Sequence, residues 1–397
     1  MYLKLIKNGE VYAPTYLGKK DILLAVDRIA MIADKIELPE HFVDIQVIDA
    51  KDKIIVPGFI DGHVHIAGAG GEGGPSSRTP GMELSQMLEG GITTVIGCLG
   101  TDGFTRTIEG VLMKAKGLRQ LGVSAWIYTG SYQVPTPTIL GDVGKDIAMI
   151  DEIIGVGEVA ISDHRSSCPS VRELARIGEH ARVGGMLGGK AGIVNLHMGD
   201  ARNPFKILYE VANSTELKLT QFLPTHCNRN DYIFEDAKEY GKKGFIDITA
   251  SSYPYFPQYE IKPAKAIVEL LKSGVPLQNI TMTSDACGSL PDFDEHGNLI
   301  KMAYGLPKSI FIELRDAVLQ EKLELEKALR VITSNPADIL KLHYKGRVRV
   351  GKDADLVIMT KRDMEIDTVI AGGEIMVKEG IVVVKGLYEH FNKSPED

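Results

Sequence analysis

The sequence has little of several features that mark other classes of protein. Its 397 residues include four cysteines, none of them in a Cys-x-x-Cys pair: Cys98, Cys168, Cys227 and Cys287. Isolated cysteines in a chain of this length are typical of reduced thiols, so we expect a cytoplasmic protein. The opening Met1–Asn8 lacks the apolar stretch of a secretory signal, and no run of about 18 apolar residues predicts a membrane span.

Dense clusters of basic residues are also absent. The chain has 45 Lys and Arg against 53 Asp and Glu, which gives a formal net charge of −8. Nucleic acids and anionic membranes bind to basic patches, so we expect neither as a partner. Hydrophobic residues make up 44% and charged residues 25%, as in an ordinary globular protein with a large core.

Short strand-like runs occupy both ends of the chain. They are Tyr2–Ile6, Ile22–Ile32 and Phe42–Ile48 near the start, and Asp355–Met359, Thr368–Ile370, Ile375–Val377 and Ile381–Val384 near the end. Neither group alone offers enough strands for a stable sheet. We therefore predict that residues 1–57 and 345–397 together form one small β-sandwich domain.

The residues between these ends, 58–344, alternate between strand-like and helix-like runs. The strand candidates are Phe59–Ile66, Thr93–Leu99, Ser124–Thr129, Val159–Ser162, Gly192–His197, Phe222–Cys227, Ile246–Ala250 and Ile280–Ser284. The clearest helical patterns are Val171–Ala181, Pro263–Lys272, Ser309–Leu319 and Leu325–Ile332. Eight strands that alternate with helices predict an α/β fold, a (β/α)8 TIM barrel.

Side chains that bind metals follow the predicted barrel strands. His63 and His65 lie two residues apart on the first strand, so both point to the same face, where they could share a metal. His197, His226 and Asp285 end three other strands, and the functional residues of such barrels lie at these ends. Imidazole and carboxylate suit Zn²⁺ or a similar divalent ion. Any one histidine is more often structural, but five such residues at strand ends make coincidence the poorer explanation.

These segments resemble the amidohydrolase superfamily and, within it, the β-aspartyl (isoaspartyl) dipeptidases. The resemblance extends over nearly the whole chain and rests on His63-Val64-His65, Ser162–Ser166, Asn195–Gly199, Pro224–Arg229, Ser284–Ser289 and the closing Gly351–Val357. The His-Val-His motif and the closing segment identify only the superfamily. Asp163–Ser166 and Thr225–Arg229 are much more specific.

The resemblance implies a site with two Zn²⁺ ions per subunit. His63 and His65 would hold one ion, and His197 and His226 the other. Asp285 would ligate the first ion and act as general acid and base. The resemblance also implies a homo-oligomer, specifically an octamer.

The resemblance further implies residues that bind a dipeptide substrate. Their roles would be Glu72 for the free ammonium, Thr101 and Ser289 as hydrogen-bond partners, Arg165 and Arg229 for carboxylates, and Tyr132 for the scissile carbonyl. A β-aspartyl dipeptide carries one ammonium and two carboxylates, and arginine matches a carboxylate with two hydrogen bonds. The alternative for the two arginines is a surface ion pair.

One position departs from the commoner family pattern. A carboxylated lysine usually bridges the two metals, whereas Glu158 stands at the matching position here. A glutamate also offers two anionic oxygens, but it is shorter, so the metals or the backbone must lie closer to it. A single metal or a lost second site are the alternatives. We favour a pair bridged by Glu158, because His197 and His226 both remain to hold the second ion.

The predicted function is a zinc metallopeptidase that hydrolyses the β-aspartyl amide bond of dipeptides with metal-activated hydroxide. A cyclic-amide hydrolase, such as a dihydroorotase or hydantoinase, or a deaminase would use the same metals. The alternative from a different class is a catalytically silent barrel that acts as a scaffold.

Overall fold

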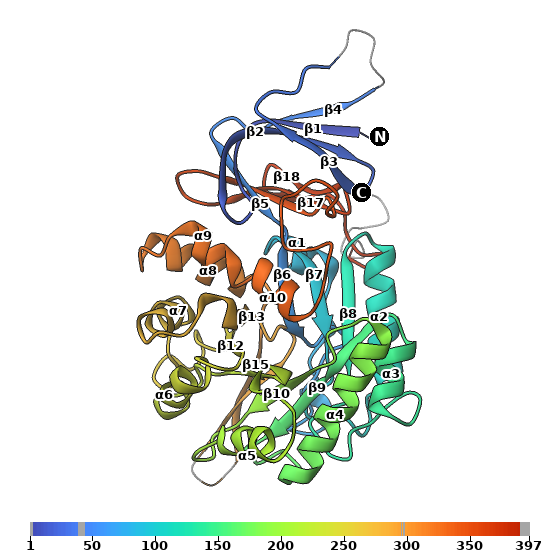
Figure 1. Ribbon diagram of the computed structural model, residues 1–397, viewed down its shortest axis with the longest axis vertical. Coiled ribbons are helices and arrows are strands. Elements are labelled where there is room, and N and C mark those ends of the chain that lie inside the picture. The colour runs from blue at the N-terminus through green and yellow to red at the C-terminus, as the bar shows by residue number, and fades with distance from the viewer. Residues whose placement is uncertain (1–2, 39–43, 295, 297, 390–397) are drawn as a thin grey trace.

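Eight parallel strands follow one another around the centre of the molecule (Figure 1). The computed structural model describes residues 3–38, 44–294, 296 and 298–389. Six of the strands form one sheet, in the order β6 (Phe59–Val64), β7 (Ile92–Gly97), β8 (Ser124–Thr129), β9 (Ile153–Ile161), β10 (Ile193–Met198) and β11 (Phe222–Thr225). The last two, β12 (Ile246–Thr249) and β13 (Ile280–Thr283), pair with each other.

Backbone hydrogen bonds join the two sheets into a closed barrel. The Cys227 amide donates to the Asp247 carbonyl over 3.1 Å, which links the end of β11 to β12. On the other side, the His65 amide donates to the Ala286 carbonyl over 2.9 Å, and Val64 and Ala286 form a parallel bridge. The segment after β13 therefore meets the end of β6, and the predicted (β/α)8 barrel is confirmed.

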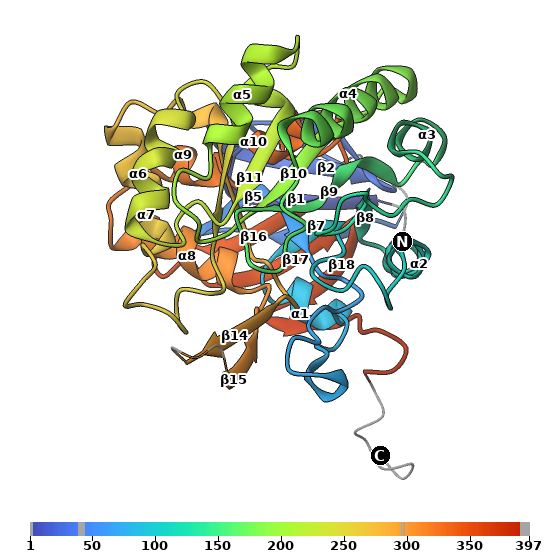
Figure 2. The same ribbon diagram turned by 90° about the horizontal axis from the view of Figure 1, so that it is seen from below.

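Helices surround the barrel strands (Figure 2). They are α2 (Ile108–Gln120), α3 (Val143–Met149), α4 (Val171–Gly188), α5 (Lys206–Ser214), α6 (Asp231–Tyr240), α7 (Pro263–Lys272), α8 (Ser309–Leu319), α9 (Leu325–Arg330) and α10 (Ser334–Ile339), with the short α1 (Leu84–Leu88) before β7. Helix α4 shows how the sequence sets their limits. Ser170 and Glu173 form a capping box at its start, and Gly189, with φ of 64°, ends it.

Both ends of the chain contribute to one nine-stranded sheet. Its strands are β1 (Leu3–Tyr12), β2 (Tyr16–Ala25), β3 (Arg28–Ala33), β4 (Gln46–Asp49), β5 (Lys53–Pro57), β16 (Leu356–Thr360), β17 (Ile366–Ala371), β18 (Glu374–Lys378) and β19 (Ile381–Val382). Strands β5 and β16 pair antiparallel, with Pro57 opposite Leu356. Apolar side chains from the N-terminal and C-terminal strands pack into a core separate from that of the barrel.

Several strand limits differ from those predicted. The run Ile22–Ile32 is two strands, β2 and β3, because the chain turns at Val26, where φ is 56°. Strand β9 begins at Ile153, six residues before its predicted start at Val159, since Gly155 and Gly157 interrupt the apolar pattern. Strand β5 and the hairpin of β14 (Ser289–Phe293) and β15 (Leu299–Tyr304) were not predicted. Residues 2, 42 and 43 of two predicted strands lie outside the described residues.

Candidate active site

Two buried histidines, His63 at the end of β6 and His65 directly after it, face two carboxylates from distant parts of the chain. The Nε2 atoms of His63 and His65 lie 3.4 and 3.7 Å from Glu158 Oε2. The same nitrogens lie 3.6 and 3.1 Å from Asp285 Oδ1. Neither carboxylate oxygen has a hydrogen-bond partner, although both are buried. A buried anionic oxygen without a donor is costly, so these four side chains fit a cation between them.

The second oxygen of Glu158 faces the other pair of histidines. Glu158 Oε1 lies 2.7 Å from His197 Nδ1 and 3.2 Å from His226 Nε2. Glu158 comes from β9, His197 from β10, and His226 follows β11 directly. The predicted metal ligands therefore converge on one rim of the barrel, with Glu158 between the two histidine pairs.

Three of these histidines have their other ring nitrogen held by a neighbouring polar group. The contacts are His63 Nδ1 to Asn195 Oδ1 at 2.9 Å, His197 Nε2 to Asp163 Oδ2 at 2.9 Å, and His226 Nδ1 to Thr249 Oγ1 at 2.8 Å. Such contacts fix the ring orientation and the tautomer of a histidine that binds a metal. Each nitrogen turned toward Glu158 is therefore the one available to a cation.

The pKa values of the cluster reflect burial and the charges of neighbouring side chains. Burial opposes protonation of His63, but the Cys98 sulfur and the Glu158 carboxylate raise the pKa of this imidazole well above its ordinary value. Burial likewise favours the neutral form of Glu158, yet His63 and His197 hold its pKa well below the usual range. Burial and the neighbouring His197 lower the pKa of His226 to about 4. The cluster attracts positive charge, and a divalent ion would compete with these protons.

A cavity of about 470 Å³ opens over this cluster. Of the residues that the sequence analysis proposed, the lining includes His65, Thr101, Tyr132, Arg165, His197, His226, Arg229, Asp285 and Ser289. The hydroxyl of Tyr132 lies 2.7 Å from His197 Nδ1, so it reaches the same edge of the cluster as Glu158. The cavity gives a small molecule access to the carboxylates and imidazoles at its base.

Glu72 accepts hydrogen bonds from three of the other predicted substrate-binding residues. Its Oε1 accepts hydrogen bonds from Ser289 at 2.7 Å, Arg165 at 3.0 Å and Thr101 at 3.2 Å. Its Oε2 is buried and has no hydrogen-bond partner. Burial raises the pKa of Glu72, but its hydrogen bond from Ser289 and the Arg165 charge outweigh that effect and lower the pKa below the usual value. Glu72 thus keeps one anionic oxygen ready for a donor.

Comparison with known proteins shows the family to which this chain belongs. Residues 223–376 match the model of the Amidohydrolase family. The structure of β-aspartyl dipeptidase from the thermophilic, keratin-degrading Fervidobacterium islandicum AW-1, in complex with β-Asp-Leu dipeptide, is 40% identical in sequence, with a TM-score of 0.89 over 96% of this chain and 98% of that one. This chain belongs to the β-aspartyl dipeptidase family of amidohydrolases. A second structure of that dipeptidase is 39% identical, with a TM-score of 0.86 over the same shares of the two chains.

Other proteins are similar to this chain over part of its sequence or in fold alone. A dihydroorotase from Staphylococcus epidermidis is 38% identical over 109 residues, which cover 28% of this chain and 24% of that enzyme. The match thus spans about a quarter of the curated relative. A D-hydantoinase from Thermus sp. is 16% identical, with a TM-score of 0.67 over 96% of each chain, and shows the same fold. No helix in the described part of this amidohydrolase is long and apolar enough to cross a membrane.

Both arginines of the predicted substrate site are paired within this amidohydrolase. Arg165 donates from Nε and Nη2 to Asp163, over 3.0 Å each, and its guanidinium lies 5.4 Å from the Tyr132 ring centre. Arg229 donates from Nε and Nη2 to Asp200 over 2.8 and 2.9 Å. The Nη1 of Arg229 has no hydrogen-bond partner among the described residues, and Arg229 lines the cavity. A substrate carboxylate would therefore share these arginines with Asp163 and Asp200.

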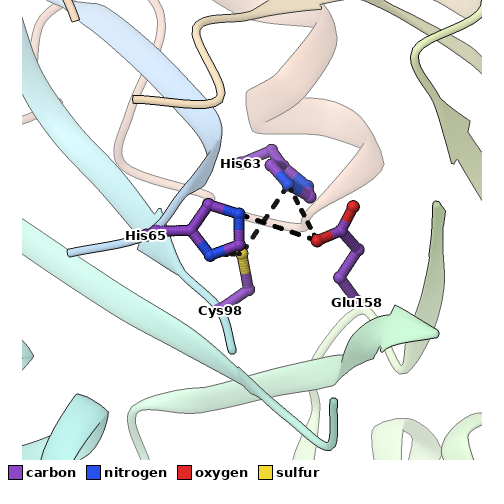
Figure 3. Close-up of side chains that lie close together, drawn as sticks. All are labelled: His63, His65, Cys98 and Glu158. Atoms are coloured by element: carbon purple, nitrogen blue, oxygen red, sulfur yellow. Dashed lines mark hydrogen bonds and ion pairs between the residues drawn. The ribbon is translucent and has the colours of Figure 1, made fainter. Parts of the chain in front are cut away.

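Several site residues were missed by the sequence analysis of this amidohydrolase. Asn195, Asp163 and Thr249 hold the histidine rings. Asp163 and Asn195 lie in segments that carry the family resemblance, but the sequence assigns no role to any of the three. Cys98 is different, because it directly follows β7 at the rim where the metal ligands lie. Its sulfur lies 3.7 Å from both His63 Nε2 and His65 Nδ1 (Figure 3). The rule that placed His197 and His226 at strand ends would also have found Cys98.

Proposed function

We propose that this amidohydrolase is a zinc peptidase that hydrolyses the β-aspartyl amide bond of dipeptides. The position of Glu158 carries the proposal, since each of its oxygens faces one pair of histidines beneath the cavity. The similarity to a dipeptidase whose structure holds β-Asp-Leu supports the substrate class. A scaffold protein would gain nothing from the buried, unpaired oxygens of Glu158 and Asp285.

The donor set fits two divalent ions. His63, His65, Asp285 and Glu158 Oε2 would hold one ion, and His197, His226 and Glu158 Oε1 the other. Bound there, such ions lower the pKa of water toward neutrality and polarise a carbonyl oxygen. Imidazole and carboxylate donors together suit Zn²⁺.

Asp285 and Tyr132 are proposed to move and hold protons. Burial raises the pKa of Asp285, but the neighbouring His65 outweighs it, so the carboxylate is charged and can accept a proton from water. Asp285 would then pass this proton to the leaving amine. Burial and the charge of Glu158 raise the pKa of Tyr132 well above its ordinary value. Its hydroxyl therefore stays protonated and can donate to the carbonyl oxygen as negative charge develops there.

Glu72, Thr101, Ser289, Arg165 and Arg229 are proposed to select the β-linked isomer. A β-aspartyl and an α-aspartyl dipeptide carry the same charges, but in the β-isomer the ammonium lies one carbon farther from the scissile carbonyl. The unpaired Glu72 Oε2 would accept from that ammonium, and the arginines would hold the two carboxylates. When all three charges are held in fixed positions, the amide bond of the β-isomer lies at the cations and that of the α-isomer does not.

Arg229→Ala is expected to raise KM for β-Asp-Leu roughly 10- to 100-fold with a smaller change in kcat, because a hydrogen bond to a charged group contributes about 1.5–3 kcal/mol. Steady-state kinetics measure both constants. Asp200→Asn is the matched control, since it breaks the ion pair but keeps the guanidinium, and it should change KM less. Equal effects of the two variants would mean that Arg229 acts only through its ion pair.

Metal analysis of the purified protein is expected to give about two zinc ions per chain, because Glu158 presents one oxygen to each histidine pair. Elemental analysis by mass spectrometry measures the ratio. One ion per chain at full activity would instead favour the single-metal alternative.

A substrate panel tests the proposed function. β-Asp-Leu should be hydrolysed, whereas α-Asp-Leu, dihydroorotate and hydantoin should not. Cyclic-amide hydrolysis is the second candidate, because part of the chain, 109 residues, is 38% identical to a dihydroorotase. Turnover of dihydroorotate or hydantoin without turnover of β-Asp-Leu would replace the proposal with that candidate.

The remaining expectations complete the proposal. We propose that residues 58–344 form the hydrolase domain, that residues 1–57 and 345–397 form the β-domain, and that the protein is a cytoplasmic homo-oligomer. The pairing of β5 with β16 supports the shared β-domain.

A further inference from the structure

Cys98 lies inside the cluster of predicted metal ligands. The residue is fully buried, and its sulfur is 3.7 Å from His63 Nε2 and 3.7 Å from His65 Nδ1 (Figure 3). The donor atoms of His63, His65, Cys98 and Glu158 all lie within 4.8 Å of one another. His63 lies on β6, Glu158 on β9, and His65 and Cys98 directly follow β6 and β7, so the barrel itself brings them together.

The distances from His63 agree with donors that share one ion, whereas His65 contacts the sulfur through Nδ1 and turns its Nε2 toward Glu158 and Asp285. Zinc binds sulfur at about 2.3 Å and nitrogen or oxygen at about 2.0–2.1 Å, so tetrahedral geometry separates nitrogen from sulfur by about 3.6 Å and nitrogen from oxygen by about 3.3 Å. The observed separations from His63 Nε2 are 3.7 Å to Cys98 Sγ and 3.4 Å to Glu158 Oε2.

A second observation points to a cation at the same place. Glu158 Oε2 is directed at His63 and His65, its side chain is 1% exposed, and it has no hydrogen-bond partner. The Cys98 thiol donates to the Val64 carbonyl over 3.6 Å and not to this oxygen. A buried carboxylate oxygen beside a thiol and two imidazoles, with no donor, calls for a positive charge among them.

We propose that the Cys98 sulfur is a ligand, as thiolate, of the ion held by His63 and His65. This inference rests on the metal site of the proposed function. It gives that ion a sulfur donor in addition to nitrogen and oxygen. Sulfur ligands favour zinc over magnesium, calcium and manganese, so Cys98 would narrow the choice of metal.

The other three cysteines have different surroundings. Cys227 donates to the Pro224 carbonyl over 3.3 Å, and burial raises the pKa of its thiol. Burial also raises the pKa of the Cys287 thiol, to about 12. Cys168 is exposed. Cys227 is therefore the matched control: it is a buried thiol that directly follows the predicted ligand His226, but its sulfur belongs to neither cluster of candidate metal ligands among the described residues.

X-ray absorption at the zinc edge tests the proposal directly. The zinc-loaded wild-type protein and Cys227→Ala should show a sulfur neighbour at about 2.3 Å, which Cys98→Ala and Cys98→Ser should lack. Cobalt-loaded protein gives a second readout, because a sulfur-to-cobalt charge-transfer band in the near ultraviolet should disappear in the Cys98 variants alone. Cys98→Ser should also lower zinc affinity by at least roughly tenfold.

A wild-type spectrum with only nitrogen and oxygen neighbours would overturn the proposal, whether or not the variants fold. A sulfur neighbour that persists in a folded Cys98→Ala protein would overturn it as well. Neither measurement uses a substrate. A zinc–sulfur contact in a protein that is inactive on β-aspartyl dipeptides would therefore support the sulfur ligand and count against the proposed function only.

Discussion

Asp285→Asn is expected to lower kcat for β-Asp-Leu by about 10²- to 10⁴-fold, the range that a general acid and base contributes. The asparagine has nearly the same shape but cannot take up a proton, and it is a weaker, neutral ligand beside His65. The backbone should tolerate the change, because residue 285 has φ of 55° and asparagine adopts that region more readily than most residues. Steady-state kinetics, with zinc content and thermal unfolding measured on the same sample, separate loss of chemistry from loss of fold.

Asp292→Asn is the matched control for this variant. Asp292 also lines the cavity, but it lies on β14 and outside the metal cluster. Its substitution should leave kcat within a few-fold of wild type. If Asp285→Asn kept wild-type kcat with its full zinc content, Asp285 would have no part in proton transfer.

Glu158→Gln is expected to lower kcat by more than roughly 100-fold and to reduce the zinc content. Substitution of a residue that only orients a metal ligand typically lowers metal affinity or activity 10- to 100-fold. Glu158 faces both histidine pairs directly, so a larger loss is expected. The neutral amide has one oxygen in place of two, so one pair of histidines loses its anionic partner. Zinc analysis together with kinetics measures both effects.

Glu313→Gln controls for the removal of any buried carboxylate. Glu313 is 5% exposed, burial raises its pKa to about 7, and it accepts a hydrogen bond from the Ala264 amide on α7, outside the described cluster. This variant should keep both metals and activity. Full activity of Glu158→Gln with two zinc ions per chain would exclude Glu158 as the bridge.

The barrel could be predicted from the sequence because eight short strand-like runs alternate with helix-like runs between the two ends of the chain. The strand-end rule located His197, His226 and Asp285, since their place at strand ends is a property of the chain alone. Prediction failed where the local pattern is not that of a strand. The glycines of β9 interrupt the apolar pattern of its first half, and the half-buried hairpin of β14 and β15 shows no apolar alternation.

The detailed contacts of the site could not be predicted in the same way. Which ring nitrogen of His63 faces the cation depends on its hydrogen bond to Asn195, which lies 132 residues away. The ion pair of Arg165 with Asp163 depends on the fold of a single loop. The place of Cys98 after β7 is open to the strand-end rule, but its contacts with His63 and His65 depend on how β6 and β7 pair.

Removal and return of the metal, assayed on two isomeric dipeptides, tests most directly whether cations held at the barrel rim cut the β-aspartyl bond. Chelator-treated protein should hydrolyse neither β-Asp-Leu nor α-Asp-Leu. Added Zn²⁺ should restore hydrolysis of β-Asp-Leu alone, with kcat/KM at least roughly 100-fold above that for α-Asp-Leu. Metal-free protein that still cleaves β-Asp-Leu, or restored protein that cleaves both isomers equally, would contradict the account.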